Sequence, residues 1–186
     1  MADFVRCKAC GYITVKDAIG DVCPACGVPA KMFEPYTQPV SAKRRRILDL
    51  HSHPVMVHFP QAFALTLFLL SCFALFAPEA VKNKTDAAIQ VLSVLLPFFV
   101  AGAIATGLLD GKLRFRKVTT PMLKKKILLS LIFFAISVVL AVEAVSGRHS
   151  IISSPVIYIV LTFAISLCGA LLGLIGGKLL NARFPG

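Results

Sequence analysis

The sequence predicts a small β-rich metal ribbon at the N-terminus, followed by an all-α bundle of four transmembrane helices. Two observations lead to this fold class. Four cysteines in two Cys-x-x-Cys pairs lie in a hydrophilic segment near the N-terminus. The remainder contains long uncharged runs, in a chain of 186 residues that is 57% hydrophobic and only 16% charged. Because a soluble domain of this length carries more charge, we expect a membrane protein with a small soluble head.

The two cysteine pairs are Cys7-Lys-Ala-Cys10 and Cys23-Pro-Ala-Cys26. Two such pairs, close together in one short segment, predict four thiolates that converge on one metal ion. A glycine follows each pair, at Gly11 and Gly27. Glycine readily adopts the positive φ that turns backbone N–H groups toward the ligating sulfurs. Hydrogen bonds from these N–H groups stabilise thiolate charge and help to set a reduction potential.

The ligand set alone suits both zinc and iron, because each binds four thiolates in a tetrahedron. The local sequence motif is Cys-x-x-Cys-Gly-Tyr-Ile followed by Cys-Pro-x-Cys-Gly-x-Pro, with Phe33 after it. Over about residues 4–36 it resembles the short rubredoxin-like module of rubrerythrins. The resemblance implies one redox-active iron, with Tyr12 and Phe33 packed beside it. The iron would be held by Cys7, Cys10, Cys23 and Cys26. A structural zinc ribbon is the alternative that the ligand set leaves open.

The chain is expected to have three parts: a metal domain at residues 1–36, a linker with a basic juxtamembrane segment at 37–52, and a membrane domain at 53–186. Pro35 and Pro39 predict an extended, semi-stiff linker over residues 34–42. The basic run Lys43–Arg46 follows it. Such a run binds either nucleic-acid phosphate or anionic lipid. Its place just ahead of an apolar span favours membrane lipid, with no nucleic-acid partner.

The four spans are expected at about residues 55–77, 87–109, 124–145 and 155–177, long enough for a hydrocarbon core of about 30 Å. Basic residues concentrate in the connection at 110–126, whereas the other two connections are nearly balanced. The positive-inside rule then places both termini, the metal domain and the middle connection in the cytoplasm. No secretory signal is visible in residues 1–50. These observations predict a multi-pass protein of the cytoplasmic membrane, whose reducing side suits free thiolates.

A second candidate site begins the first span, in the stretch His51-Ser-His53-Pro-Val-Met-Val-His58-Phe-Pro60. With Thr106-Gly107-Leu-Leu-Asp110, it resembles an uncharacterised four-helix bacterial membrane family marked by His-Pro-x-x-x-His-Phe-Pro. That resemblance covers roughly residues 50–145. Members of the family are similar to b-type cytochrome bundles, so it implies haem b as a further candidate cofactor. The candidate residues of this second redox or ligand site are His53, His58 and Asp110.

Two features count against a haem bound within one chain. His53 and His58 are five residues apart, so on a regular helix they point about 140° apart. The family usually has a further histidine at the start of the third span, where this sequence has the lysines 124–126. A haem would need Met56, Met122 or a ligand from another subunit, as in a homo-oligomer. The plainer interpretation is that the two histidines are interfacial residues that bond to Asp110 and to helix ends.

These patterns predict a membrane-anchored one-electron carrier at the cytoplasmic membrane face. Its partner would be a redox protein or a membrane redox subunit, linked to quinone or haem. No catalytic dyad and no nucleotide-binding glycine loop occurs in the sequence, which favours an electron-transfer protein or subunit over an independent enzyme. The alternative function is a structural zinc ribbon that serves as an assembly or interaction module on a membrane scaffold.

Overall fold

The computed structural model describes residues 3–37, 41–116, 118–146 and 155–181. The chain divides into two units: Met1–Arg46 with Gly177–Gly186, and Ile47–Gly176. Three of the features expected from the sequence lie wholly or largely outside the described residues. They are Pro39 of the linker, residues 147–154 of the connection between the third and fourth predicted spans, and the last five residues of the membrane domain.

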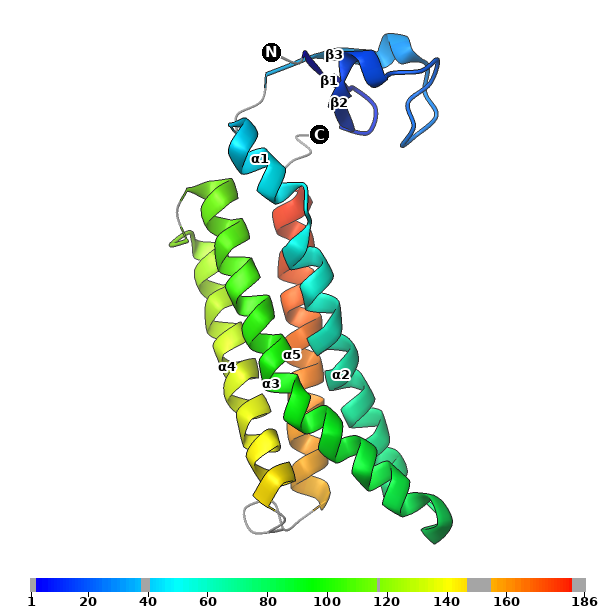
Figure 1. Cartoon of the computed structure of the whole chain (residues 1–186), viewed down its shortest axis with the longest axis vertical. Coiled ribbons are helices and arrows are strands. Elements are labelled where there is room, and N and C mark those ends of the chain that lie inside the picture. Colours follow the sequence, from blue (N-terminus) through cyan, green and yellow to red (C-terminus); the bar gives the residue numbers. More distant parts are fainter. Residues whose placement is uncertain (1–2, 38–40, 117, 147–154, 182–186) are drawn as a thin grey trace. The chain divides into compact units, whose positions relative to one another are not determined.

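The first unit contains a three-stranded antiparallel sheet with the strand order β2-β1-β3 (Figure 1). The strands are β1 (Phe4–Cys7), β2 (Ile13–Val15) and β3 (Phe33–Tyr36). Arg6 lies opposite Glu34 in the register and donates two hydrogen bonds to its Oε1, at 3.1 and 2.5 Å. Opposite charges on facing positions stabilise the pairing of two strands. The first residues of the predicted linker therefore belong to the sheet, as part of β3.

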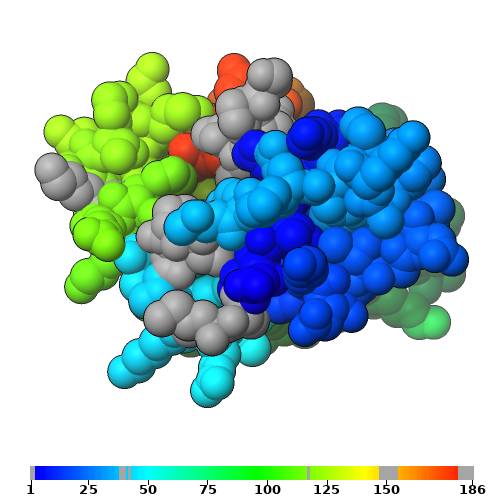
Figure 2. All heavy atoms as spheres, turned by 90° about the horizontal axis from the view of Figure 1, so that it is seen from above, coloured from blue at the N-terminus to red at the C-terminus, as the bar shows by residue number. Residues whose placement is uncertain are grey.

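Two short 3-10 helices, Lys16–Ala18 and Ala30–Met32, complete the first unit. Its described residues include only three that are buried, namely Val5, Cys7 and Cys23. Figure 2 shows the atoms of the N-terminal residues, in blue, as one closely packed group. Three side chains bury too little apolar surface to offset the entropy lost on folding. The stability of this unit must therefore depend on what its two buried cysteines bind.

The helices are α1 (Ala42–Leu48), α2 (Ser52–Ala74), α3 (Glu79–Phe115), α4 (Pro121–Ser146) and α5 (Pro155–Asn181). The basic run at 43–46 is helical, as part of α1. In the second unit α3 packs against both α2 and α4 (Figure 1). Hydrogen bonds join α5 to α2, from Gln61 Nε2 to the Gly169 carbonyl and from Ser166 Oγ to the Ala64 carbonyl, each at 3.0 Å.

Four helical segments in the described part of the chain are long and apolar enough to cross a membrane. They are Lys43–Ala74, Glu79–Phe115, Pro121–Ser146 and Pro155–Leu179. Leucines and phenylalanines are exposed on their outer faces, among them Leu69, Leu131 and Leu174. A helix that is apolar on its outer face as well suits lipid better than water. The predicted fold class of a small metal ribbon followed by four apolar helices is confirmed. Helix α3, which contains the second predicted span at 87–109, extends beyond that span at both ends.

Candidate functional site

The sulfur atoms of Cys7, Cys10, Cys23 and Cys26 gather at one point in the first unit. All four Sγ atoms lie within 4.8 Å of one another. The Sγ atoms of Cys7 and Cys26 are 3.8 Å apart, and those of Cys10 and Cys23 are also 3.8 Å apart. A tetrahedral metal with thiolates at about 2.3 Å requires sulfur atoms about 3.8 Å apart. All four cysteines are free of disulfides. The residues therefore fit a four-thiolate metal, iron or zinc.

The two cysteine pairs form equivalent turns, although their sequences differ. The N–H of Gly11 donates to the Cys7 carbonyl at 2.9 Å, and the N–H of Gly27 donates to the Cys23 carbonyl at 2.8 Å. The two glycines have φ of 76° and 75°. In each turn the first cysteine also donates its N–H to the carbonyl five residues later, at 2.8 Å. The positive φ predicted at both glycines is confirmed.

Replacing Gly27 with alanine should weaken metal binding through the backbone alone. A Cβ at Gly27 would have no neighbour within 4 Å, so the cost is the positive φ, about 1–2 kcal/mol. We expect metal affinity to fall about tenfold, measured by competition with a chromophoric chelator. The matched control is Gly20→Ala, because Gly20 also has open space but no positive φ. A loss of affinity at Gly20 as large as that at Gly27 would contradict the backbone explanation.

The four thiols differ in burial and in acidity. Cys7 and Cys23 are each only 1% exposed, whereas Cys10 is partly exposed and Cys26 is exposed. Desolvation raises the pKa of Cys23, but hydrogen bonds from the N–H groups of Ala25 and Cys26 and from neighbouring thiols lower it, with a net decrease from 9.0 to about 7. The N–H of Val28 lowers the pKa of Cys26, but the neighbouring thiols and desolvation raise it to about 12. In the metal-free cluster Cys23 is therefore more acidic than Cys26.

The two aromatic residues expected beside the metal are placed differently. Phe33 lies opposite Cys7 in the register of β1 and β3 and is partly buried. Tyr12 contributes its carbonyl as the acceptor for the Cys7 N–H, while its side chain is exposed. Sheet pairing therefore holds Phe33 next to a ligand, and Tyr12 supports the site through its backbone.

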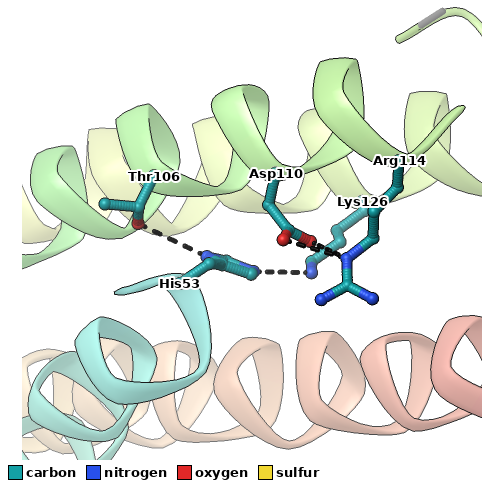
Figure 3. Close-up of polar contacts among 5 residues, drawn as sticks. All are labelled: His53, Thr106, Asp110, Arg114 and Lys126. Atoms are coloured by element: carbon teal, nitrogen blue, oxygen red, sulfur yellow. Dashed lines mark hydrogen bonds and ion pairs between the residues drawn. The ribbon is translucent and has the colours of Figure 1, made fainter. Parts of the chain in front are cut away.

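In the second unit, His53 lies in a polar cluster at one end of the bundle, which we call the His53 cluster. Its members are His53 of α2, Thr106, Asp110 and Arg114 of α3, and Lys126 of α4 (Figure 3). The His53 Nε2 lies 2.9 Å from the Lys126 Nζ, and the His53 Nδ1 lies 3.4 Å from the Thr106 Oγ1. Three helices thus meet at one imidazole.

The hydrogen bonds of the His53 cluster define which nitrogen of the imidazole carries a proton. Thr106 Oγ1 donates to the Gly102 carbonyl at 2.8 Å, so it accepts from the Nδ1–H of His53. The Nε2 of this neutral imidazole then accepts from the Lys126 ammonium. A metal or haem iron would need the same Nε2 lone pair. The arrangement therefore does not leave His53 ready to bind haem.

Asp110 pairs with Arg114 and makes no hydrogen bond to His53 in the described structure. The Nε of Arg114 donates to both carboxylate oxygens of Asp110, at 2.9 and 2.8 Å. The expectation that the histidines bond to Asp110 is therefore wrong for His53, whose ring nitrogens contact Thr106 and Lys126 instead. Asp110 still lies close enough to His53 to act on it electrostatically.

His58 lies apart from the His53 cluster, on the outside of the bundle. It is exposed on the same stripe of α2 as Val55, Leu65 and Leu69. No hydrogen bond or ion pair of His58 is present among the described residues. The structure thus brings His53 and Asp110 into one cluster and places His58 outside it.

Arg114 was not singled out in the sequence, and Thr106 and Lys126 were noted only as parts of a motif and of a lysine run, not as partners of His53. The signal available there was the placement of charged residues just inside the ends of apolar spans. A charged residue in that position either reaches toward water or finds a polar partner in the bundle. Pattern alone does not show which of the lysines at 124–126 turns inward, because that depends on the rotation of α4 against its neighbours.

Comparison with known proteins identifies the N-terminal part of the chain. Residues 6–34 match the family model described as rubrerythrin, rubredoxin-like domain. No curated protein and no solved structure matches the chain. The matched residues contain the four cysteines and end within β3. The chain therefore carries an N-terminal rubredoxin-like domain of the rubrerythrin type, whose four cysteines form a metal site.

Proposed function

We propose that this chain is a membrane-anchored one-electron carrier with iron in the four-cysteine site. The observation that supports the proposal most directly is the tetrahedral spacing of four sulfurs in a rubredoxin-like domain. Iron held by four thiolates exchanges one electron between its ferric and ferrous states. Cys7, Cys10, Cys23 and Cys26 would hold it in both states.

The two turns suit a site whose charge changes by one without rearrangement. Backbone hydrogen bonds fix both turns, and the N–H groups of Ala25 and Cys26 point at the Cys23 sulfur. These donors are held by the fold, so they need not reorganise when the charge on the sulfurs changes. Cys26 is the exposed ligand of the site. It offers the shortest path by which an electron would reach a partner.

A structural zinc ribbon is the second candidate function, because zinc also binds four thiolates in a tetrahedron. The shortage of other buried residues in the first unit favours it, since structural zinc often supplies the folding energy of a small domain. The absorption spectrum of the purified full chain distinguishes the two. Ferric iron with four thiolates gives a red protein, whereas zinc gives a colourless one. Stoichiometric zinc without iron in protein from iron-replete cells would contradict the electron-carrier proposal.

We also propose that the chain spans the cytoplasmic membrane with both termini and the metal domain in the cytoplasm. The support is the excess of basic residues in the connection between α3 and α4. Cysteine labelling tests this topology with the variants Asn83→Cys and Phe115→Cys. In sealed cells an impermeant reagent should label residue 83 but not residue 115, beyond the labelling of the parent protein. The reverse pattern would refute the orientation.

The electron partner would be a redox protein or a membrane redox subunit that is linked to quinone or haem. The exposed Cys26 edge of the metal site is the natural contact for such a protein. Haem b bound by this chain itself gains no support from His53, because its Nε2 accepts from Lys126. Exposed His58 would serve only in a complex, either with a second copy of the chain or with another subunit.

A further inference from the structure

We propose that the His53 cluster binds a phosphate-type oxyanion at the end of the bundle, with Lys126 and Arg114 as its donors. This proposal is independent of the metal in the N-terminal domain. It concerns five residues on three helices: His53 of α2, Thr106, Asp110 and Arg114 of α3, and Lys126 of α4.

The first argument is charge. The cluster contains two cations, Arg114 and Lys126, and one carboxylate, Asp110. The carboxylate is bound to the guanidinium of Arg114, and Lys126 forms no ion pair with the residues that the structure describes. The His53 imidazole is neutral and accepts a hydrogen bond from Lys126, so it adds no charge that could balance the ammonium. One positive charge is therefore left unneutralised at the end of an apolar bundle, where an uncompensated charge is costly.

The second argument is the number of unused N–H donors. Among the residues that the structure describes, Arg114 bonds only through its Nε, to Asp110, so within this part of the chain both terminal nitrogens of the guanidinium remain available. Lys126 uses its ammonium on His53 Nε2 and keeps further N–H donors. Figure 3 shows the terminal nitrogens of Arg114 directed away from the Asp110 carboxylate. Arg114 lies close enough to Lys126 to act on it electrostatically. Guanidinium and ammonium donors near one another suit the oxygens of a phosphate.

The third argument is that neighbouring helices hold the donors in place. The side chain of Arg114 is only 12% exposed and that of Asp110 only 22%. A Cβ at Gly107 of α3 would lie 2.9 Å from the His53 Cε1, so the imidazole lies directly against the α3 backbone. A Cβ at Gly176 of α5 would lie 3.9 Å from the Lys126 Nζ. Lys126 therefore lies inward beside α2 and α5, whereas its neighbours Lys124 and Lys125 are exposed.

The oxyanion has two sources, the headgroup of an anionic phospholipid or free phosphate. The test uses the purified full chain in a neutral detergent at fixed ionic strength. Dihexanoyl phosphatidylglycerol, dihexanoyl phosphatidylcholine and inorganic phosphate are titrated separately. Binding is measured by native mass spectrometry and by the shift in the thermal unfolding midpoint. The test variant is Lys126→Gln and the control is Lys125→Gln, which makes the same charge change at an exposed position of the same helix.

We expect Lys126→Gln to weaken binding about tenfold, because it removes a charge-assisted hydrogen bond, and Lys125→Gln to weaken it less than about twofold. If only the binding of phosphatidylglycerol depends on Lys126, the ligand is a lipid headgroup. The same dependence for inorganic phosphate identifies a free oxyanion, and either result supports the site. Equal losses in the two variants, or unchanged binding in Lys126→Gln, would overturn it.

A second variant covers the case in which Lys126→Gln does not fold. Arg114→Lys keeps a cation beside Asp110 but removes the two terminal nitrogens of the guanidinium. The proposal expects this variant to bind phosphatidylglycerol or phosphate several-fold more weakly, because an ammonium does not reproduce the planar fork. Binding equal to that of the unsubstituted protein would also overturn the proposal.

Discussion

Serine in place of Cys23, or of Cys10, is expected to abolish stoichiometric metal binding and to unfold residues 4–33. Three thiolates leave the tetrahedral site open. Cys23 is also one of only three buried residues among those described in the first unit. The unit then loses its main source of folding free energy. Metal analysis of the purified full chain measures the first effect, and susceptibility of the N-terminal segment to proteolysis measures the second.

The matched control for this prediction is Cys72→Ser. Cys72 is a free cysteine of α2 and lies outside the metal cluster. It should leave both the metal content and the protease resistance of the N-terminal segment unchanged. Full metal content with intact redox behaviour in either Cys10→Ser or Cys23→Ser would contradict the four-ligand assignment.

The second large effect is expected from Leu67→Ala in the bundle. Leu67 is completely buried, in a cluster that includes Leu96, Phe133 and Ile165 of the other three helices. Removing its side chain leaves a cavity, which should cost about 2–4 kcal/mol of the free energy of unfolding. The chain has no tryptophan, so far-ultraviolet circular dichroism during denaturation in detergent is the suitable measurement.

Leu69→Ala is the control, since Leu69 lies in the same helix but is 56% exposed. Removing the Leu69 side chain should lower the free energy of unfolding by less than about 1 kcal/mol, because lipid replaces the lost contacts when the protein lies in a membrane. Equal costs at the two positions would mean that α2 packs with a different face than the structure shows. A larger cost at Leu69 would indicate that this stripe of α2 faces another protein.

The N-terminal domain was largely predictable because its information is local. The spacing of the four cysteines and the two glycines defines both turns, and the structure reproduces the predicted positive φ at Gly11 and Gly27. The pairing of β3 with β1 was less visible. Pro35 suggested a linker, yet it lies opposite Val5 in the sheet. Proline is compatible with an edge strand, and β3 is at the edge of the strand order.

The His53 cluster was predictable only in part because it depends on contacts between distant residues. His53 and Lys126 are 73 positions apart in the sequence. The histidine motif correctly indicated which end of α2 contributes to the cluster. The partner of His53, however, depends on how α3 and α4 are rotated about their axes. Helix ends were similarly underdetermined. Hydropathy shows where the apolar part of α3 lies, whereas its charged ends at Glu79–Asp86 and Asp110–Phe115 are helical without being apolar.

The most direct test of the central claim is a reductive titration of the purified full chain, followed by its visible absorption. The account predicts that the iron–thiolate bands bleach with the uptake of one electron per chain and return on reoxidation. Cys7, Cys10, Cys23 and Cys26 hold the metal in both states, so the cycle should repeat without loss of iron. A colourless, zinc-loaded protein, or iron that is released on reduction, would contradict the claim that this chain is a one-electron carrier.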